Sequence, residues 1–381
     1  MNSAASSPLR LSCGLVLKNR LIKTAMSEKM AENLLPSSNH ERLYMHWAEG
    51  GWAALITGNI MVSDQYLGSN EDVAVTGSKS ALLKKWSSWT GAAQGQNCHM
   101  IAQFAIPINL GDNFVAKLIR ILVFGTPKAM TRHDIDVVIA QFTEAARLAF
   151  KAGFQGVEVH AAHGFLLSQF MSSKSNERDD EFGGSADNRV ELVLRIIRSI
   201  RKEVPESFCV GVKINSADFR DEKGMFDMLR QIELIQKEEI DYINLSGGSF
   251  EDPQMMSTGS SLKPSSTENR SSIREGFFLR TSQEIRKSFP ELTLIVSGGF
   301  RSRIGINGAI DNSACDLIGV GRPAVKYPDL PTRIMFNDSI SDTDARFDVE
   351  AAPGAGWLAS KVRSVGAGAE TKYWASVMQN L

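Results

Sequence analysis

Two histidines three residues apart, His160 and His163, are the most suggestive side chains for chemistry in this sequence. They follow the β-branched residues Val157 and Val159, whose alternation predicts that the histidines end a buried strand. Buried imidazoles need hydrogen-bonding partners, so a pair placed there indicates a functional site. A metal pair, as in a zinc-dependent barrel hydrolase, is one interpretation. No third or fourth ligand is evident in the sequence, so we expect no bound metal.

A second group of residues is typical of a phosphate site. Ser297-Gly298-Gly299 ends one apolar run, and Gly319-Val320-Gly321-Arg322 ends the next. Glycines let backbone N–H groups approach an anion, and Arg322 can add a charged clamp. Either glycine pair alone is commonly just a tight turn. Together with the arginine, they favour a phosphate site.

Lys213 lies within the otherwise apolar run CVGVKINS and needs a negative partner if it is buried. An ion pair with Glu158, which shares the parity of His160, would be a structural role. Contact with an electron-rich ligand atom would be a functional role. The pattern is compatible with both.

The elements that must position these residues alternate between short apolar runs and amphipathic stretches. Helices are expected over 134–152 and 189–204. This alternation predicts a single (β/α)8 barrel rather than an open doubly wound sheet, because the strands are evenly spaced and no GxGxxG follows the first. We expect eight strands at Leu21–Met26, Ala53–Met61, His99–Ile106, Gly156–Ala162, Cys209–Ser216, Tyr242–Gly248, Leu292–Gly299 and Leu317–Ala324.

The whole chain, 1–381, is expected to form one domain, with the barrel over about 20–335 and a tail over 336–381 that carries no recognisable chemistry. A hairpin around Cys13-Gly14 would cap the lower end of the barrel. A long loop after the sixth strand, 251–275, is typical of either a lid or a disordered segment.

Barrel enzymes of this kind carry their chemistry at the carboxyl ends of the strands. The notable polar residues and glycines of this sequence fall at those predicted ends, which favours one shared active site over a set of unrelated turn residues. They are Ser27, Asn59, Gln103, His160, His163, Lys213, Asn215, Ser246-Gly247-Gly248, Ser297-Gly298-Gly299 and Gly321-Arg322.

Composition excludes several partners. The formal net charge of −1 gives no long-range attraction to nucleic acid or to an acidic membrane. No apolar run approaches the ~20 residues needed to cross a bilayer, and no secretory signal is evident. The four cysteines form no CxxC motif, so we expect them to act as small buried hydrophobic residues in a reducing compartment. A cytoplasmic location is expected.

From about Leu9 to Pro331 the sequence resembles the old yellow enzymes and related NADH:flavin oxidoreductases, which are FMN-binding TIM barrels. The motifs that carry the resemblance are LKNRLIKTAMSE (17–28), WAEGGWAALITGNIMV (47–62), FGTPKAMTRHDIDVVIAQFTEAARLAFKAGFQGVEVHAAHG (124–164), QFMSSKSNERDDEFGGSADNR (169–189), VGVKINSADF (210–219), INLSGG (243–248) and CDLIGVGRP (315–323).

The resemblance implies FMN across the barrel mouth and NADPH or NADH as reductant. Ala25, Met26 and Ser27 would line the isoalloxazine, Asn59 and Gln103 would touch its pyrimidine side, Lys213 would face N1/O2, and Gly298, Gly299, Gly321 and Arg322 would hold the phosphate. A small-molecule substrate is implied, and a specialised metabolite of secondary metabolism is the hypothesis for its class. A homodimer is compatible with the resemblance.

The resemblance also implies a role for the histidines. His160 and His163 would donate hydrogen bonds to the carbonyl oxygen of an α,β-unsaturated compound, so that hydride from flavin N5 can reach the β-carbon and the resulting enolate is stabilised. This is the chemistry of an ene-reductase.

Phe165 departs from the family pattern, because family members usually carry a tyrosine there that protonates the substrate. Phe165 could simply pack against substrate, with reduction continuing more slowly through another proton source. Alternatively, the loss of the phenol could favour dehydrogenation or isomerisation.

A second departure follows the third strand. The family pattern Gln-Leu-x-His-x-Gly-Arg is replaced by Gln103-Phe104-Ala105-Ile106-Pro107-Ile108-Asn109, and an apolar loop, FVAKLIRILVF, comes next. This change could suit a bulky hydrophobic substrate or weaken contacts with the cofactor. A barrel that has lost redox chemistry is therefore a further hypothesis, beside the metal hydrolase.

Overall fold

The computed structural model describes residues 3–107, 129–216, 222–246, 281–349 and 363–381, together with residues 279 and 352. Eight parallel strands follow one another around a ring, and the last, β11, pairs with the first, β3, which closes the barrel predicted from the sequence. The strands are β3 (Leu21–Lys23), β4 (Ala54–Met61), β6 (His99–Ala105), β7 (Gly156–Ala161), β8 (Cys209–Asn215), β9 (Tyr242–Ser246), β10 (Leu294–Ser297) and β11 (Leu317–Val320).

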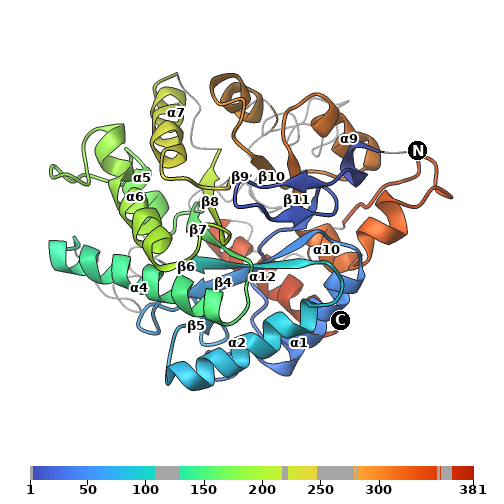
Figure 1. Cartoon of the computed structure of the whole chain (residues 1–381), viewed down its shortest axis with the longest axis horizontal. Helices are drawn as coiled ribbons and strands as arrows, with labels where there is room; N and C mark the ends of the chain where they lie inside the picture. The colour runs from blue at the N-terminus through green and yellow to red at the C-terminus, as the bar shows by residue number, and fades with distance from the viewer. Residues whose placement is uncertain are drawn as a thin grey trace.

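Helices surround the barrel (Figure 1). They are α1 (Ser38–Glu49), α2 (Lys79–Ala93), α4 (Arg132–Lys151), α6 (Ala186–Glu203), α7 (Glu222–Gln236), a helix over 281–288, α9 (Arg303–Asp311) and α10 (Arg322–Lys326). The two helices expected at 134–152 and 189–204 correspond to α4 and α6. Each begins a few residues earlier than expected, because Thr131 and Ser185 cap their first turns through side-chain oxygens.

The predicted hairpin closes the lower end of the barrel. Strands β1 (Leu9–Arg10) and β2 (Val16–Leu17) pair antiparallel, and Gly14 supplies the positive φ of 88° at their turn. Leu11 and Leu17 are buried in a cluster that includes Ile22 and Ile56 of the barrel strands. We call residues 9–17 the plug.

Several strand ends differ from the prediction. The eighth strand ends at Val320 rather than Ala324, because Arg322 begins α10 and Pro323 fits its first turn. The seventh ends at Ser297, since Gly298 and Gly299 have φ of 102° and 90°. The first ends at Lys23 rather than Met26. The short strand β5 (Val73–Ala74), which pairs with β4, was not expected.

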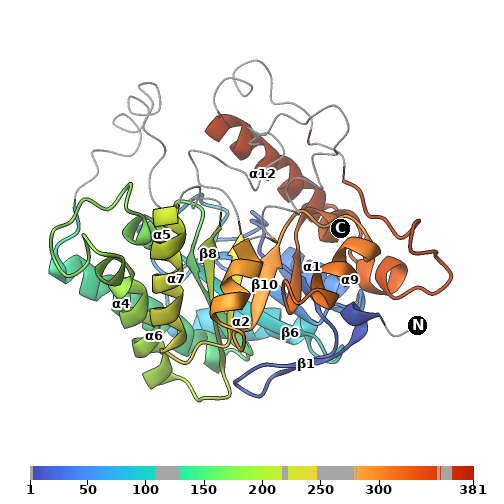
Figure 2. The same cartoon turned by 90° about the horizontal axis from the view of Figure 1, so that it is seen from above.

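The tail, in which no chemistry was recognised, contains a helix that the sequence did not predict. Residues Arg363–Gln379 form helix α12, which packs against α1 and α10. Trp374, Ala375 and Met378 are its buried apolar contacts. Figure 2 shows α12 on one side of the barrel and the β1 hairpin on the other. Helix α12 therefore lies at the end of the barrel that is formed by the carboxyl ends of the strands.

Three predicted features lie outside the described residues. They are the apolar loop 114–124 together with Ile108 and Asn109, the glycines Gly247 and Gly248, and the long loop 251–275. Among the helices that the structure describes, none is long and apolar enough to cross a membrane.

Candidate active site

One cavity of about 730 Å³ opens at the carboxyl ends of the barrel strands. All ten residues expected to contact a flavin line it, and so do the three residues expected to face the substrate. The first set is Ala25, Met26, Ser27, Asn59, Gln103, Lys213, Gly298, Gly299, Gly321 and Arg322, and the second is His160, His163 and Phe165. The barrel thus brings together residues that span about 300 positions of the sequence.

The floor of the cavity is a chain of buried hydrogen bonds. Ser297 Oγ lies 3.1 Å from Thr24 Oγ1 and donates to Asn244 Oδ1 at 2.8 Å. The Asn244 amide then donates to Glu158 Oε2 at 2.8 Å. Gln103 Nε2 donates to the other Glu158 oxygen at 2.5 Å, which leaves the Gln103 carbonyl oxygen as an acceptor for a ligand.

Lys213 lies beside this chain on β8 with only 3 % of its surface exposed. Lys213 forms no ion pair with Glu158, which was the structural role considered from the sequence; the two Glu158 oxygens instead accept amide hydrogens from Gln103 and Asn244. Among the described residues, no hydrogen bond or ion pair holds the Lys213 ammonium. Burial lowers the pKa of Lys213, and the charge of Glu158 opposes that shift. A buried cation in this position favours an anionic or electron-rich ligand.

The two histidines lie against each other above the floor. His160 is the fifth residue of β7, and its ring centre is 5.0 Å from that of His163. His163 adopts a positive φ of 59°, and its backbone N–H donates to Asn215 Oδ1 at 3.0 Å. Its Nε2 lies 2.9 Å from Ser246 Oγ. Asn215 and Ser246 therefore orient this histidine.

Burial keeps both imidazoles neutral. It lowers the pKa of His160 well below its ordinary value, and the charges of His163 and Lys213 lower it further. It lowers the pKa of His163 in the same way, with Lys213 as the second cause. His160 Nδ1 is buried and has no hydrogen-bond partner among the described residues. The unused nitrogen of a neutral imidazole can donate a hydrogen bond to a ligand atom or accept one from it.

The segment that carries Ala25, Met26 and Ser27 is fixed from behind. Glu28, which follows it, accepts hydrogen bonds from Tyr44 Oη at 2.5 Å and from the Gly58 backbone N–H at 2.8 Å. These contacts tie the segment to α1 and to β4. Asn59, next to Gly58, has a buried Oδ1 without a partner among the described residues. The segment and Asn59 are thus held ready for a ligand.

The expected phosphate side is formed by glycines and by two helices. Gly298 could carry a Cβ without meeting any atom within 4 Å, so there is open space beside its backbone. Arg322 lines the cavity from α10, and its Nη1 lies 2.6 Å from Glu370 Oε1 of α12. Lys372 and Trp374 of the same helix also line the cavity.

Helix α12 was not expected from the sequence to contribute to the site. The spacing of the apolar residues Trp374, Ala375 and Met378 is the signal that could have indicated a helix with one buried face. The preceding Ala/Gly-rich stretch obscured it. Glu370 has 2 % of its surface exposed, so this part of the tail belongs to the site.

The polar groups that line the cavity fit FMN and do not fit a metal. The unpartnered side-chain carbonyl oxygen of Asn59, the buried ammonium of Lys213 and the glycine cradle suit a flat polar ring with a phosphate. Within the described parts of the chain, the one group of three side chains that could bind a metal is Cys13, Cys209 and Asp241. That group does not include either histidine, so a zinc hydrolase gains no support.

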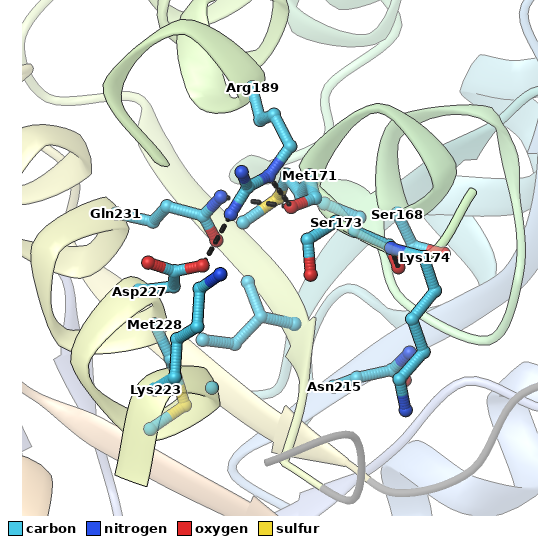
Figure 3. A pocket seen from close by; sticks show the side chains of 14 residues that line it. Ser168, Met171, Ser173, Lys174, Arg189, Asn215, Lys223, Asp227, Met228 and Gln231 are labelled. Atoms are coloured by element: carbon cyan, nitrogen blue, oxygen red, sulfur yellow. Dashed lines mark hydrogen bonds and ion pairs between the residues drawn. The ribbon is translucent and has the colours of Figure 1, made fainter. Parts of the chain in front are cut away.

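A second, smaller cavity of about 120 Å³ lies between β8 and the helices α5 (Leu166–Met171), α6 and α7. Figure 3 shows Arg189 reaching across it to Asp227 and to the Met171 carbonyl oxygen, with contacts of 2.6 and 3.0 Å. Arg189 belongs to the polar motif after the histidines. Its contacts hold α5 in place, and α5 begins directly after Phe165.

Comparisons with known proteins agree with this arrangement. A model of the NADH:flavin oxidoreductase / NADH oxidase family matches residues 7–338. The NADH-dependent flavin oxidoreductase iliE of Hypocrea jecorina is 39% identical over 368 residues, covering 90% of this chain and 91% of that protein. The NADH-dependent flavin oxidoreductase iccE of Talaromyces variabilis is 36% identical over 362 residues, covering 87% and 86%.

Solved structures show the same fold. An old yellow enzyme homologue from Zymomonas mobilis superposes with a TM-score of 0.69 at 19% identity, covering 97% of this chain and 99% of that one. Morphinone reductase superposes with a TM-score of 0.68 at 20% identity, covering 87% and 89%.

Proposed function

Because the chain belongs to the NADH:flavin oxidoreductase / NADH oxidase family, we propose that it is an FMN-dependent oxidoreductase that acts on a conjugated carbonyl compound. FMN would bind non-covalently in the cavity and, when bound, accept or donate hydride. NADH is the reductant we propose, since the relatives reported above are named NADH-dependent.

The observation that carries the proposal is the buried Lys213 ammonium, which no described residue pairs. Reduced flavin is electron-rich, and a cation beside its pyrimidine ring stabilises negative charge there. Gln103 and Asn59 offer amide acceptors and donors to the same ring. Gly298, Gly299 and Arg322 would hold the phosphate, with Arg322 shared between it and Glu370.

His160 and His163 would bind the carbonyl oxygen of the substrate. Neutral imidazole N–H groups donate hydrogen bonds without adding a fixed charge, so they stabilise the oxygen more as negative charge develops on it. Ser246 and Asn215 hold His163 in place, so this donor needs little reorganisation. The half of the cavity above the histidines is apolar at Phe165, Met61 and Pro107, which suits a hydrophobic substrate.

A second candidate function follows from Phe165. Holding an enolate oxygen without a nearby phenol to protonate the carbon would favour dehydrogenation or isomerisation over net reduction. The relatives reported above come from fungi. We propose a specialised metabolite of the secondary metabolism as the substrate class.

An anaerobic absorbance spectrum of the purified protein, before and after NADH, tests the proposal. A flavin band that bleaches with NADH and returns with a cyclic enone would support a reductase. A flavin band that NADH leaves intact, while a saturated or isomerisable ketone is turned over, would support the second candidate. Absence of flavin even after soaking in FMN would contradict both.

A further inference from the structure

A pair of cysteines lies at the opposite end of the barrel from the active site. Cys13 is in the turn of the plug, and Cys209 is the first residue of β8. The two sulfurs and a carboxylate oxygen of Asp241 all lie within 4.8 Å of one another. Both cysteines pack in an apolar cluster, as expected from the sequence, but their proximity to each other was not expected. They are 196 positions apart in the sequence and meet only in the fold.

Asp241 fixes the geometry of this pair. Its Oδ1 accepts the Cys13 backbone N–H at 2.7 Å, and its Oδ2 accepts the Val210 backbone N–H at 2.7 Å. Arg201 Nη2 donates to the same Oδ2 at 2.9 Å. Since both oxygens are engaged and a guanidinium lies beside them, the carboxylate is poorly placed to bind a metal. The contacts instead hold the plug against the start of β8.

The two thiols are unequal. Cys209 is fully buried, whereas Cys13 is partly exposed. A hydrogen bond between the two side chains lowers the pKa of Cys13 and raises that of Cys209, as expected when a thiol donates its proton to a neighbouring thiolate. The more exposed cysteine is thus also the one that ionises more readily. A reactive cysteine beside a second thiol is the arrangement of redox-sensitive pairs.

We propose that Cys13 and Cys209 form a peroxide-reactive dithiol that closes to a disulfide and joins the plug to β8. The Cys13 thiolate attacks hydrogen peroxide, an S–O bond forms, the O–O bond breaks and hydroxide leaves. The Cys209 sulfur then attacks the sulfenic sulfur, so the S–S bond forms, the S–O bond breaks and the departing hydroxide takes the Cys209 proton as water. The hydroxide released in the first step combines with the proton that Cys13 lost on ionisation, so two thiols are oxidised while one peroxide is reduced to two waters.

This modification would stabilise the fold rather than alter the active-site residues. A disulfide between residues so far apart in the sequence removes much conformational freedom from the unfolded chain. It would also fix the plug, which otherwise rests on short β1 and β2 strands and on apolar packing. The site needs no flavin, so its test is independent of the proposed function.

The test is mass spectrometry of the purified full chain after titration with hydrogen peroxide and alkylation of the remaining thiols. A peptide pair linked through Cys13 and Cys209 is expected, together with a thermal midpoint that rises by a few degrees and returns with dithiothreitol. Cys98 and Cys315 are matched internal controls, because burial raises the pKa of each to about 12. They should stay reduced in the folded protein.

Two variants and one control variant sharpen the result. C209S should leave Cys13 trapped as a sulfenic acid that dimedone labels, and C13S should abolish both labelling and the disulfide, whereas C98S should behave as the wild type. Direct oxidation of Cys13 to sulfinic acid without a disulfide would overturn the proposal. Equal reactivity of all four thiols, or one equivalent of zinc lost in C13S, would overturn it as well.

Discussion

The phenyl ring of Phe165 lies 4.6 Å from the imidazole of His160, with the two ring planes tilted by 40°. This contact puts an apolar group beside a histidine that we propose binds the substrate carbonyl, at the position where the resemblance led us to expect a phenol. Phe165 has 8 % of its surface exposed and lines the cavity. Its identity therefore bears on which reaction the site supports.

We expect F165Y to raise net reduction of a simple cyclic enone, because the added phenol can protonate the substrate carbon. A positioned acid contributes on the order of 10²–10⁴-fold, so a gain of at least about tenfold in kcat is expected. Single-turnover oxidation of the reduced protein by 2-cyclohexenone measures it. F165L is the matched control and should give no gain. A tyrosine variant that binds FMN normally but reduces the enone no faster would show that the missing phenol is not limiting.

We expect S246A to weaken binding of a carbonyl ligand by roughly fivefold, since a hydrogen bond of this kind contributes about 1 kcal/mol. The Ser246 hydroxyl is 2.9 Å from His163 Nε2, so its removal should change the balance between the two ring tautomers. ¹⁵N spectra of histidine-labelled protein report that tautomer directly, and the chain has only six histidines to assign. S246T keeps the hydroxyl, so it should retain the wild-type tautomer of His163 and the wild-type affinity for the carbonyl ligand. Unchanged His163 signals in S246A would contradict this role.

We expect K213M to weaken FMN binding by about tenfold and to lower the flavin midpoint potential, because the buried ammonium favours the more negative, reduced state. K213R keeps the charge and should retain most of the affinity. Fluorescence quenching on FMN titration and equilibrium reduction against a reference dye measure the two quantities. A potential that stays the same in K213M would mean that the Lys213 charge does not face the flavin.

The pH dependence of stability should reflect His160 and His163. Their pKa values are well below the ordinary 6.5 in the folded state, so below pH 6.5 the unfolded chain takes up protons that the folded chain does not. The free energy of unfolding should therefore fall as the pH drops below about 6.5. Between pH 7 and 8 these two histidines should change it little. Urea titrations at pH 8, 7, 6 and 5.5 measure it. The double variant H160Q/H163Q should show a shallower dependence, and an equal slope would refute this origin.

The sequence was sufficient to predict the barrel and the residues that meet in its mouth. Strand positions follow from apolar runs, and parallel strands place their carboxyl ends at one rim, so His160, Lys213 and Gly298 had to converge. What could not be predicted were the partners. The carboxylate of Glu158 could equally have met Lys213 or the amides of Gln103 and Asn244, because that choice depends on side-chain geometry across three strands.

Two further contacts could not be predicted from the sequence for the same reason, because they too depend on the folded geometry. Glu370 and Cys13 act through contacts with residues far away in the sequence, Arg322 and Cys209. No local pattern encodes such pairs. Arg322 itself was expected at a strand end, but it starts α10 because Pro323 favours a first helical turn over an extended strand.

Gly58 provides a test of how the segment 25–27, which we propose lines the flavin, is held in position. A Cβ at this residue would lie 1.9 Å from Glu28 Oε2 and 2.4 Å from the Met26 carbonyl oxygen, and the backbone oxygen cannot swing away. We expect G58A to lower the free energy of unfolding by about 2–3 kcal/mol, as overpacking of a well-packed site does. It should also weaken FMN binding, since Met26 must shift.

The matched control is Gly91, within α2, where a Cβ would meet no atom within 4 Å. G91A should leave FMN binding unchanged and raise stability by about 0.5–1 kcal/mol, because alanine has the higher helix propensity. Urea unfolding and FMN titration of both variants measure the comparison. If G58A bound FMN as the wild type does, the contact between Glu28 and Gly58 would not be what holds the 25–27 segment in place.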